Sequence, residues 1–272
     1  MAGRTISTAL LFLCFGLAAC QTVQTTRPGA IGLTRKQHMI VSEQQVEQAA
    51  VKAYAQQEQE ARSKGALDTD PALTAQVRGI AHRLIAHVGV FRPDAASWNW
   101  EVHTLKTNEI NAYCMPGGKI MVYSGLVDRL HLDDAELAAV IGHEMGHALR
   151  EHTRERVSRE YVQQIALSGV ALLTGAGQTA VDLAGAVTNV TYQLPHSREQ
   201  ETEADEIGLE LMARAGYDPE EAVTLWKKMM AAGQGGTPQF LSTHPSSKSR
   251  IQNLEQLVPK VMPLYEAARK GG

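Results

Sequence analysis

The residues best suited to chemistry in this sequence lie in one short stretch, residues 140–152, which reads VIGHEMGHALREH. His143 and His147 are four residues apart, so on a helix their imidazoles lie on one face, within reach of a single ion. Glu144 is the next residue around that helix and could reach a water held by the ion. The pattern predicts a zinc site in which the two histidines bind Zn²⁺ and Glu144 takes a proton from a water whose pKa the metal lowers to roughly 7.

A helix has to hold these side chains, and the flanking sequence predicts one. Asp133, followed by Glu136 three residues later, is typical of a capping box at a helix start. Apolar residues at helical spacing then predict a face that packs in the core: Leu137, Val140, Ile141, Met145 and Leu149. The alternative of two surface histidines would leave polar side chains unpaired on a mostly apolar segment. His152 falls nearly opposite His143 on the same helical wheel, so we expect it at the surface.

A third ligand must come from another part of the chain. Arg150 and Thr153 stand where the metzincin pattern requires glycine and histidine, which excludes that class. A second helix is predicted within residues 197–219, and it carries Glu201 and Asp205 four residues apart on one face. One carboxylate could bind the metal while the other accepts a hydrogen bond from a ligand imidazole. The spacing alone also fits a solvated acidic face.

Two segments together carry a family resemblance. GHEMGHALREH (142–152) and SREQETEADEIG (197–208) resemble the active-site segments of gluzincin metallopeptidases of the HtpX and CAAX-prenyl-endopeptidase kind, in particular of their periplasmic lipoprotein branch. The similarity covers most of residues 70–257. It implies one Zn²⁺ per chain, with His143, His147 and Glu201 as ligands. It further implies that Glu144 is the general base and that Asp205 is a supporting acid or proton donor.

Two further stretches extend this resemblance. NEINAYCMPGGKIMVYSGLV (108–127) contains Asn111 and Ala112, which the resemblance places at the edge of the substrate cleft. STHPSSKSRI (242–251) contains His244 and Arg250. By resemblance, His244 either steadies the tetrahedral intermediate or occupies the open position of zinc in a closed state. A loop histidine without a role in the chemistry is the third interpretation, and the sequence leaves all three open.

The remaining patterns predict an α+β domain that is mainly helical, with a small antiparallel sheet beside the histidine helix and the Glu-xxx-Asp helix. Helices are expected around residues 42–64 and 70–89, with His82 and His87 at the surface. Strands are expected in residues 98–105, 109–115 and 119–126, with a turn at 116–118.

Residues 161–190 are mostly apolar and small. They predict two packed core helices that turn at residues 175–177. The alternative is a membrane-facing or substrate-covering hairpin.

The first twenty residues, MAGRTISTALLFLCFGLAAC, are typical of a secretory signal, and a buried N-terminal helix is the alternative. LAAC at 17–20 resembles a bacterial lipobox, in which cleavage precedes Cys20 and the lipid is attached to it. Gln21 follows, which by the same resemblance favours the outer membrane. We therefore expect a signal peptide over 1–19, a lipidated N-terminus and tether over 20–40, and a zinc metallopeptidase domain over 41–272. The protein would sit on the inner face of the bacterial outer membrane and face the periplasm.

Composition narrows the partners. The formal net charge of −3 predicts no basic face for nucleic acid. Once Cys14 and Cys20 are assigned to the signal and the anchor, only Cys114 remains. An internal disulfide is then excluded, and Cys114 is expected to be a small buried hydrophobe rather than a nucleophile.

Together these patterns indicate a zinc endopeptidase that acts on unfolded or misassembled envelope proteins. The protein would contact the membrane through its N-terminal lipid, and the substrate would add as a strand to a sheet edge. Some members of the lipoprotein branch continue into a helical repeat domain, and we expect no such module after Gly272. The alternative is a non-proteolytic, chaperone-like or assembly lipoprotein with a latent or structural zinc site. A base at Glu144 argues against that alternative, because structural zinc sites are usually closed.

Overall fold

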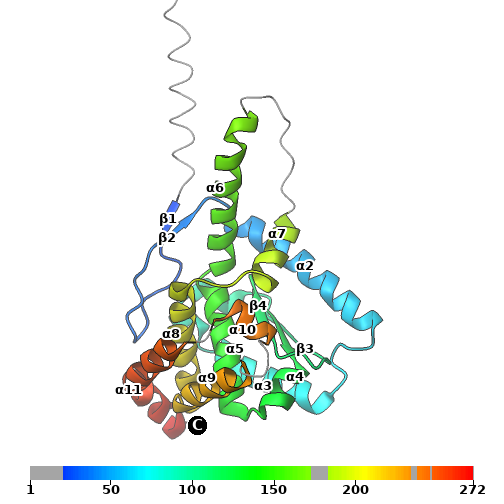
Figure 1. The fold of residues 1–272 in the computed structure, drawn as a ribbon. Coiled ribbons are helices and arrows are strands. Elements are labelled where there is room, and N and C mark those ends of the chain that lie inside the picture. Colours follow the sequence, from blue (N-terminus) through cyan, green and yellow to red (C-terminus); the bar gives the residue numbers. More distant parts are fainter. Residues whose placement is uncertain (1–20, 173–182, 234–237, 246, 272) are drawn as a thin grey trace, which may run out of the picture.

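The computed structural model describes residues 21–172, 183–233, 238–245 and 247–271. Within these ranges the chain is mainly helical with small sheets, which confirms the predicted fold class (Figure 1). The predicted signal peptide, Cys20 and the predicted turn at 175–177 lie outside the described residues. The elements are β1 (Gln21–Val23), β2 (Gln37–Met39), α2 (Glu43–Ser63), α3 (Pro71–Ile85), η1 (Val88–Val90), η2 (Pro93–Ser97), β3 (Glu101–Leu105), β4 (Ala112–Met115), β5 (Lys119–Tyr123), α4 (Ser124–Leu130), α5 (Asp134–Leu149), α6 (His152–Leu172), α7 (Leu183–Tyr192), α8 (Arg198–Arg214), α9 (Glu220–Ala232), α10 (Gln239–Thr243) and α11 (Lys248–Gly271).

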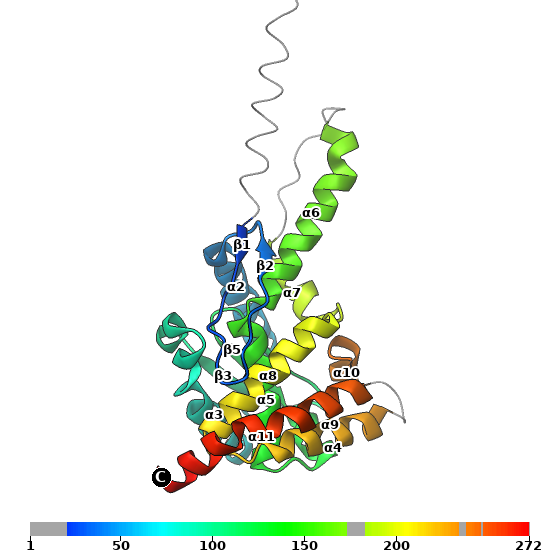
Figure 2. The ribbon, with the colours of Figure 1, turned by 90° about the vertical axis from the view of Figure 1, so that its left-hand side faces the viewer.

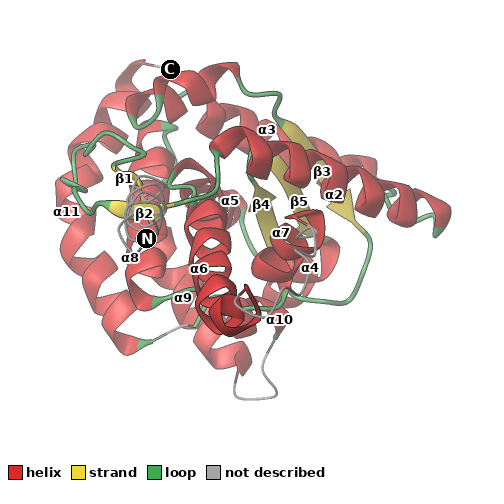
Figure 3. Ribbon diagram, turned by 90° about the horizontal axis from the view of Figure 1, so that it is seen from above, coloured by secondary structure: helices red, strands yellow, loops and turns green. Residues whose placement is uncertain are grey.

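The larger sheet has the strand order β3–β5–β4. The hairpin of β4 and β5 is antiparallel as predicted, and its turn uses Gly117 and Gly118 with left-handed φ angles of 77° and 79°. In contrast to the expected all-antiparallel sheet, β3 and β5 are parallel. Because β5 rather than β4 pairs with β3, the returning strand of the hairpin runs in the same direction as β3. In the view of Figure 3 the strands lie between α5 and α2, and β4 is the edge strand nearest α5.

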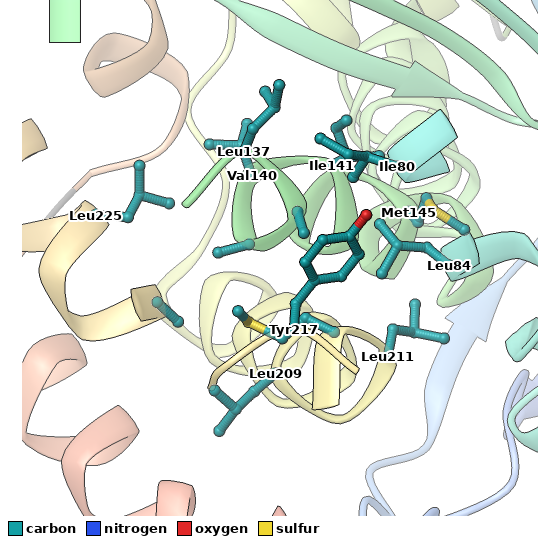
Figure 4. Close-up of a cluster of buried hydrophobic side chains, with 14 of the residues drawn as sticks. Ile80, Leu84, Leu137, Val140, Ile141, Met145, Leu209, Leu211, Tyr217 and Leu225 are labelled. Atoms are coloured by element: carbon teal, nitrogen blue, oxygen red, sulfur yellow. The ribbon is translucent and has the colours of Figure 1, made fainter. Parts of the chain in front are cut away.

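Helix α5 begins at the predicted capping box. The Asp133 side chain accepts hydrogen bonds from two backbone N–H groups, and the Glu136 carboxylate accepts one from the Asp133 backbone at 3.0 Å. The apolar face of α5 then packs against α3, α8 and α9 (Figure 4). The residues that meet there are Ile80, Leu84, Leu137, Val140, Ile141, Met145, Leu209, Leu211, Tyr217 and Leu225. This core fixes α5 and α8 side by side.

Glycines allow α5 and α8 to cross at backbone contact. A Cβ atom added at Gly208 would lie 2.7 Å from the backbone nitrogen of His143. A Cβ atom added at Gly146 would lie 2.8 Å from the carbonyl oxygen of Ala204. Any larger residue would separate the helices, so these glycines set the distance between the histidine helix and the acidic helix.

Residues 21–40 are not the extended tether that the sequence predicted. Strands β1 and β2 pair antiparallel, and the segment between them runs along α8 (Figure 2). Gln37 and Met39 are buried. Two contacts anchor the segment to α8: Arg35 binds Glu203, and the backbone N–H of Ala30 donates to Glu210 at 2.7 Å. The polar residues of this segment suggested a tether, but groups of the segment instead make hydrogen bonds to buried carboxylates of α8.

Helix α6 departs from the predicted pair of packed core helices. It projects from the body of the molecule in Figure 1, and Tyr161 and Val162 are 37% and 48% exposed. Helix α7 does pack as predicted, with Val187 and Val190 buried against α2. Within the described residues, no helix combines the length and apolar character that a membrane span requires.

Three smaller predictions can also be compared with the structure. Cys114 is buried, as predicted for a small hydrophobe, and burial raises its pKa well above the ordinary value of a thiol. His82 is exposed, as expected. His87 was also expected at the surface, but it is half-buried.

Candidate metal centre and active site

Four side chains from three elements converge on one point. Helix α5 supplies His143 and His147, α8 supplies Glu201, and the residue after α10 supplies His244. One ligand atom from each lies within 4.8 Å of all the others, and all four side chains are buried. The two Nε2 atoms of His143 and His147 are 3.1 Å apart, and Glu201 Oε1 lies 3.4 Å from His147 Nε2. Tetrahedral zinc ligands at ordinary bond lengths are about 3.3 Å apart, so this donor set fits one Zn²⁺.

An arginine and a carboxylate hold His143 in place. The His143 Nδ1–H donates to Asp205 Oδ1 at 3.0 Å, which leaves Nε2 to face the donor set. Arg250 donates to Asp205 Oδ2 at 2.7 Å and also to Glu201, and its guanidinium lies 3.7 Å from the ring centre of Trp226. Burial is the largest effect on both acids and opposes their ionisation, but the Arg250 charge and the neighbouring histidines together outweigh it. They lower the pKa of Asp205 and, more strongly, that of Glu201. Both carboxylates are therefore anionic at neutral pH.

The second histidine ligand has an unexpected partner. Burial holds the pKa of His147 well below its ordinary value, which keeps the imidazole neutral, as metal binding requires. His147 Nδ1 lies 2.8 Å from Nδ1 of His152, which is fully buried. The prediction that His152 is a surface residue is therefore wrong. Helix α5 ends at Leu149 and Glu151 adopts a left-handed φ of 52°, so the helical path is interrupted and His152, at the start of α6, lies beside His147. The prediction assumed that one helix continues through His152, whereas α5 ends at Leu149.

Glu144 is a buried carboxylate with one unsatisfied oxygen. Its Oε1 atom has no hydrogen-bond partner within the part of the chain that the structure describes, and it lies 3.5 Å from His244 Nε2. Burial raises the pKa of Glu144, and the charges of His244 and His143 oppose that effect only in part. A carboxylate with a raised pKa and a free oxygen is suited to accept a proton and return it.

His244 lies inside the cluster, not at the edge of a loop. Its Nδ1 atom is 3.0 Å from Glu201 Oε1 and 3.3 Å from His143 Nε2. Burial acts to lower the pKa of His244, but the carboxylates of Glu144 and Glu201 outweigh it and raise that pKa. His244 thus has the fourth place in the donor set.

The residues expected at the substrate cleft lie at the start of β4. Asn111 and Ala112 are buried, and Asn111 also lines a surface pocket of about 560 Å³ together with Tyr123, Tyr192 and Gln239. The backbone N–H of Phe240 donates to the carbonyl of Ile110 at 3.1 Å, so the α10 segment lies against the chain just before β4.

Sequence reasoning missed one histidine of the centre. The ring of His196 lies 4.0 Å from that of His147 and 4.9 Å from that of His244, and it is stacked on the latter. The Nη1 atom of Arg156 lies 3.2 Å from Nε2 of His196. A lone histidine in a loop carries no spacing signal, and only its place just before the Ser197 helix cap could have drawn attention to it.

Comparison with known proteins identifies related chains. The sequence profile of peptidase family M48 matches residues 71–258. The chain is 38% identical over 193 residues to the mitochondrial metalloendopeptidase OMA1 of Schizosaccharomyces pombe, over 69% of this chain and 53% of that protein. It is 27% identical over 161 residues to the metalloprotease YcaL of Escherichia coli, over 59% of this chain and 62% of that protein. It is 25% identical over 212 residues to the beta-barrel assembly-enhancing protease of the same organism, over 75% of this chain and 42% of that protein.

The chain thus spans about half the length of these relatives. They include mitochondrial as well as bacterial proteases, so they do not single out the periplasmic lipoprotein branch expected from the sequence.

Proposed function

The chain belongs to peptidase family M48, a family of gluzincin metallopeptidases, and on that premise we propose that it is a zinc-dependent endopeptidase of the bacterial cell envelope. Its substrates would be misfolded or misassembled envelope proteins. The observation that carries the proposal is the convergence of His143, His147 and Glu201 beside the unpaired carboxylate oxygen of Glu144. A purely structural zinc site would not need a buried base at that place.

The geometry of the site supports a separate role for each of its side chains. Zinc held by His143, His147 and Glu201 would supply a Lewis acid that polarises the scissile carbonyl and acidifies a water. Glu144 takes a proton from that water while the water oxygen forms a bond to the carbonyl carbon of the scissile peptide. Glu144 then returns the proton to the amine as the C–N bond breaks. Both oxygens of Asp205 are engaged by Arg250 and His143, which favours Asp205 as the support of His143 and Glu144 as the proton donor.

His244 closes the centre in this structure, and we infer that it is a plug. It lies within hydrogen-bond distance of donor atoms of His143 and Glu201, in the space where a substrate carbonyl would have to bind. The donor set is buried, so a peptide reaches it only after side chains around it move, and His244 is the one that lies among the donor atoms. Once displaced, its imidazole could still donate to a developing oxyanion, as the sequence suggested.

The proposed location rests on the N-terminal sequence and on one relative. The segment LAAC at 17–20 supports lipid attachment at Cys20, and Gln21, which follows it, supports the inner face of the outer membrane. The beta-barrel assembly-enhancing protease of E. coli is named for the assembly of beta-barrels, which supports misassembled proteins as substrates. Such a substrate would add as a strand along β4, the sheet edge that lies against α5.

The test compares the parent protein with Glu144→Gln. Cleavage of casein and of an unfolded outer-membrane protein is measured, with zinc content determined in parallel. We expect Glu144→Gln to lose cleavage and to keep its zinc, because Glu144 is not part of the proposed ligand set. Glu199→Gln, a change at an exposed glutamate of α8, is the matched control and should cleave as the parent does. Unchanged cleavage by Glu144→Gln would overturn the enzymatic assignment. Equal cleavage of folded and unfolded envelope protein would overturn the substrate class.

A further inference from the structure

The two histidine ligands are supported in different ways. His143 reaches a carboxylate directly, at Asp205. His147 reaches one only through a second histidine, since its Nδ1 lies 2.8 Å from His152 Nδ1 and His152 Nε2 lies 2.9 Å from Glu203 Oε2. His147, His152 and Glu203 are all buried, so solvent offers none of them an alternative partner.

Only one arrangement of protons fits this chain of contacts. If His147 turns the lone pair of Nε2 toward the metal, its Nδ1 carries the hydrogen and donates to His152. The Nδ1 atom of His152 must then be the acceptor, so its hydrogen is on Nε2 and is donated to Glu203. Both hydrogen bonds therefore point away from the metal centre, and the second ends on the Glu203 carboxylate.

Glu203 is in turn held by two arginines. Arg150, which is fully buried, donates to Glu203 Oε1 at 2.8 Å. Arg35 donates to both oxygens of Glu203 at 2.8 Å and also binds Glu155. Arg35 comes from the segment between β1 and β2, and Gln37, the first residue of β2, donates to the Arg150 carbonyl at 2.7 Å. The N-terminal segment thus contacts the far end of the chain that begins at His147.

We propose that His152, Glu203 and Arg35 form a positioning relay that fixes the ring of His147 for zinc binding, and that residues 25–37 are thereby part of the metal centre. This relay presupposes the function proposed above, because it can position His147 for zinc only if the site binds zinc. Removal of a group that orients a ligand histidine typically weakens metal affinity 10- to 100-fold. The relay therefore makes zinc affinity depend on a residue from the N-terminal segment that does not contact any of the ligands.

The test measures apparent zinc affinity of the full chain by competition with a chromophoric chelator. His152→Phe keeps the ring volume and removes both nitrogens, and it should weaken zinc binding about 10- to 100-fold. His152→Gln should recover part of this loss, because its amide can accept from His147 and donate to Glu203. Arg35→Met should weaken binding in the same direction but less, since Arg150 remains on Glu203. Arg62→Met is the matched control, because it breaks an arginine–glutamate pair within α2, at Glu58, and should keep the parent affinity.

Two further measurements separate positioning from folding. Thermal unfolding in excess EDTA reports the stability of each metal-free variant, and the absorption spectrum of the Co²⁺-substituted protein reports the ligand geometry. A parent-like affinity and cobalt spectrum for His152→Phe would overturn the relay, as would equal losses for His152→Phe and His152→Gln. A parent protein that binds no zinc would instead overturn the proposed function.

Discussion

The glycine contact between α5 and α8 makes a quantitative prediction about metal binding. Gly208 lies two turns after Glu201 on α8, against the α5 backbone at His143. The change Gly208→Ala adds one Cβ atom to this contact. That atom would lie 2.7 Å from the His143 backbone nitrogen, whereas ordinary van der Waals contact begins at 3.4 Å. Because both sides of the contact are helix backbone, no side-chain rotation can relieve it.

The size of the effect follows from these distances. The helices must separate by about 0.7 Å at the contact to restore an ordinary distance. Metal–ligand distances in a well-formed site lie within about 0.2 Å of their ordinary values. Glu201 would therefore move out of range of the zinc that His143 and His147 hold. We expect zinc affinity to fall by about tenfold or more and the metal-free protein to lose about 1–3 kcal/mol of stability, the usual cost of overpacking.

Chelator competition measures the affinity, and urea unfolding in EDTA measures the stability. The matched control is Gly79→Ala in α3, since Gly79 is a helical glycine whose added Cβ would meet nothing within 4 Å. This control should leave zinc binding unchanged and stabilise the protein by about 0.5–1 kcal/mol through helix propensity. Parent-like zinc affinity and metal-free stability in Gly208→Ala would refute the reasoning, because the helices would then have absorbed the methyl group without separating.

Three further predictions concern other parts of the molecule. His244→Ala should retain zinc and cleave casein faster if His244 is a plug; a slower rate would assign it to the oxyanion, and an unchanged rate would exclude both roles. Burial acts to raise the pKa of Glu155, but hydrogen bonds from Arg35 and two glutamines lower it from 4.5 to about 2. Glu155 therefore contributes stability above about pH 4.5 that is lost as the pH falls toward 2, and urea unfolding across this range should show a smaller loss in Arg35→Met. Cys20→Ala should release the protein from membranes in cell fractionation, and retention in the membrane fraction would contradict lipid attachment at that residue.

The sequence predicted those parts of the centre that depend on regular helix geometry. The spacing of His143 and His147 places both imidazoles on one face of any helix, so their convergence required no tertiary information. Glu201 and Asp205 share a face for the same reason, but their choice over other acids rested on family resemblance. His152 could not be placed in this way, because its position depends on where α5 stops and on the left-handed Glu151 that follows.

Long-range contacts account for the other differences. The order β3–β5–β4 depends on which strand pairs with β3, and alternation of apolar residues does not encode that choice. Polar residues in the segment 21–40 resemble those of a flexible linker, yet Arg35 and Gln37 satisfy buried groups from α5, α6 and α8. Composition separates polar from apolar residues, but it does not tell whether a polar residue will meet water or a buried carboxylate.

The structure also divides the donor set into a rigid part and a separable part. His143, His147 and Glu201 lie on helices that are locked together by glycine contacts and by the core. The segment that carries His244 is held in part by two backbone hydrogen bonds, from Phe240 to Ile110 and from His196 to Thr243, and by the buried ring of Phe240.

Breaking two such bonds and exposing one phenylalanine costs roughly 4–5 kcal/mol. The contacts of His244 with Glu201 and Glu144 add to this cost. Separating α5 from α8 would expose the whole core and cost far more. A substrate is therefore expected to gain access by displacing the His244 segment while the metal-binding helices stay fixed. Under that condition His244→Ala removes the imidazole from the centre but leaves Phe240 and the two backbone hydrogen bonds in place, so its rate reports the contribution of the imidazole alone.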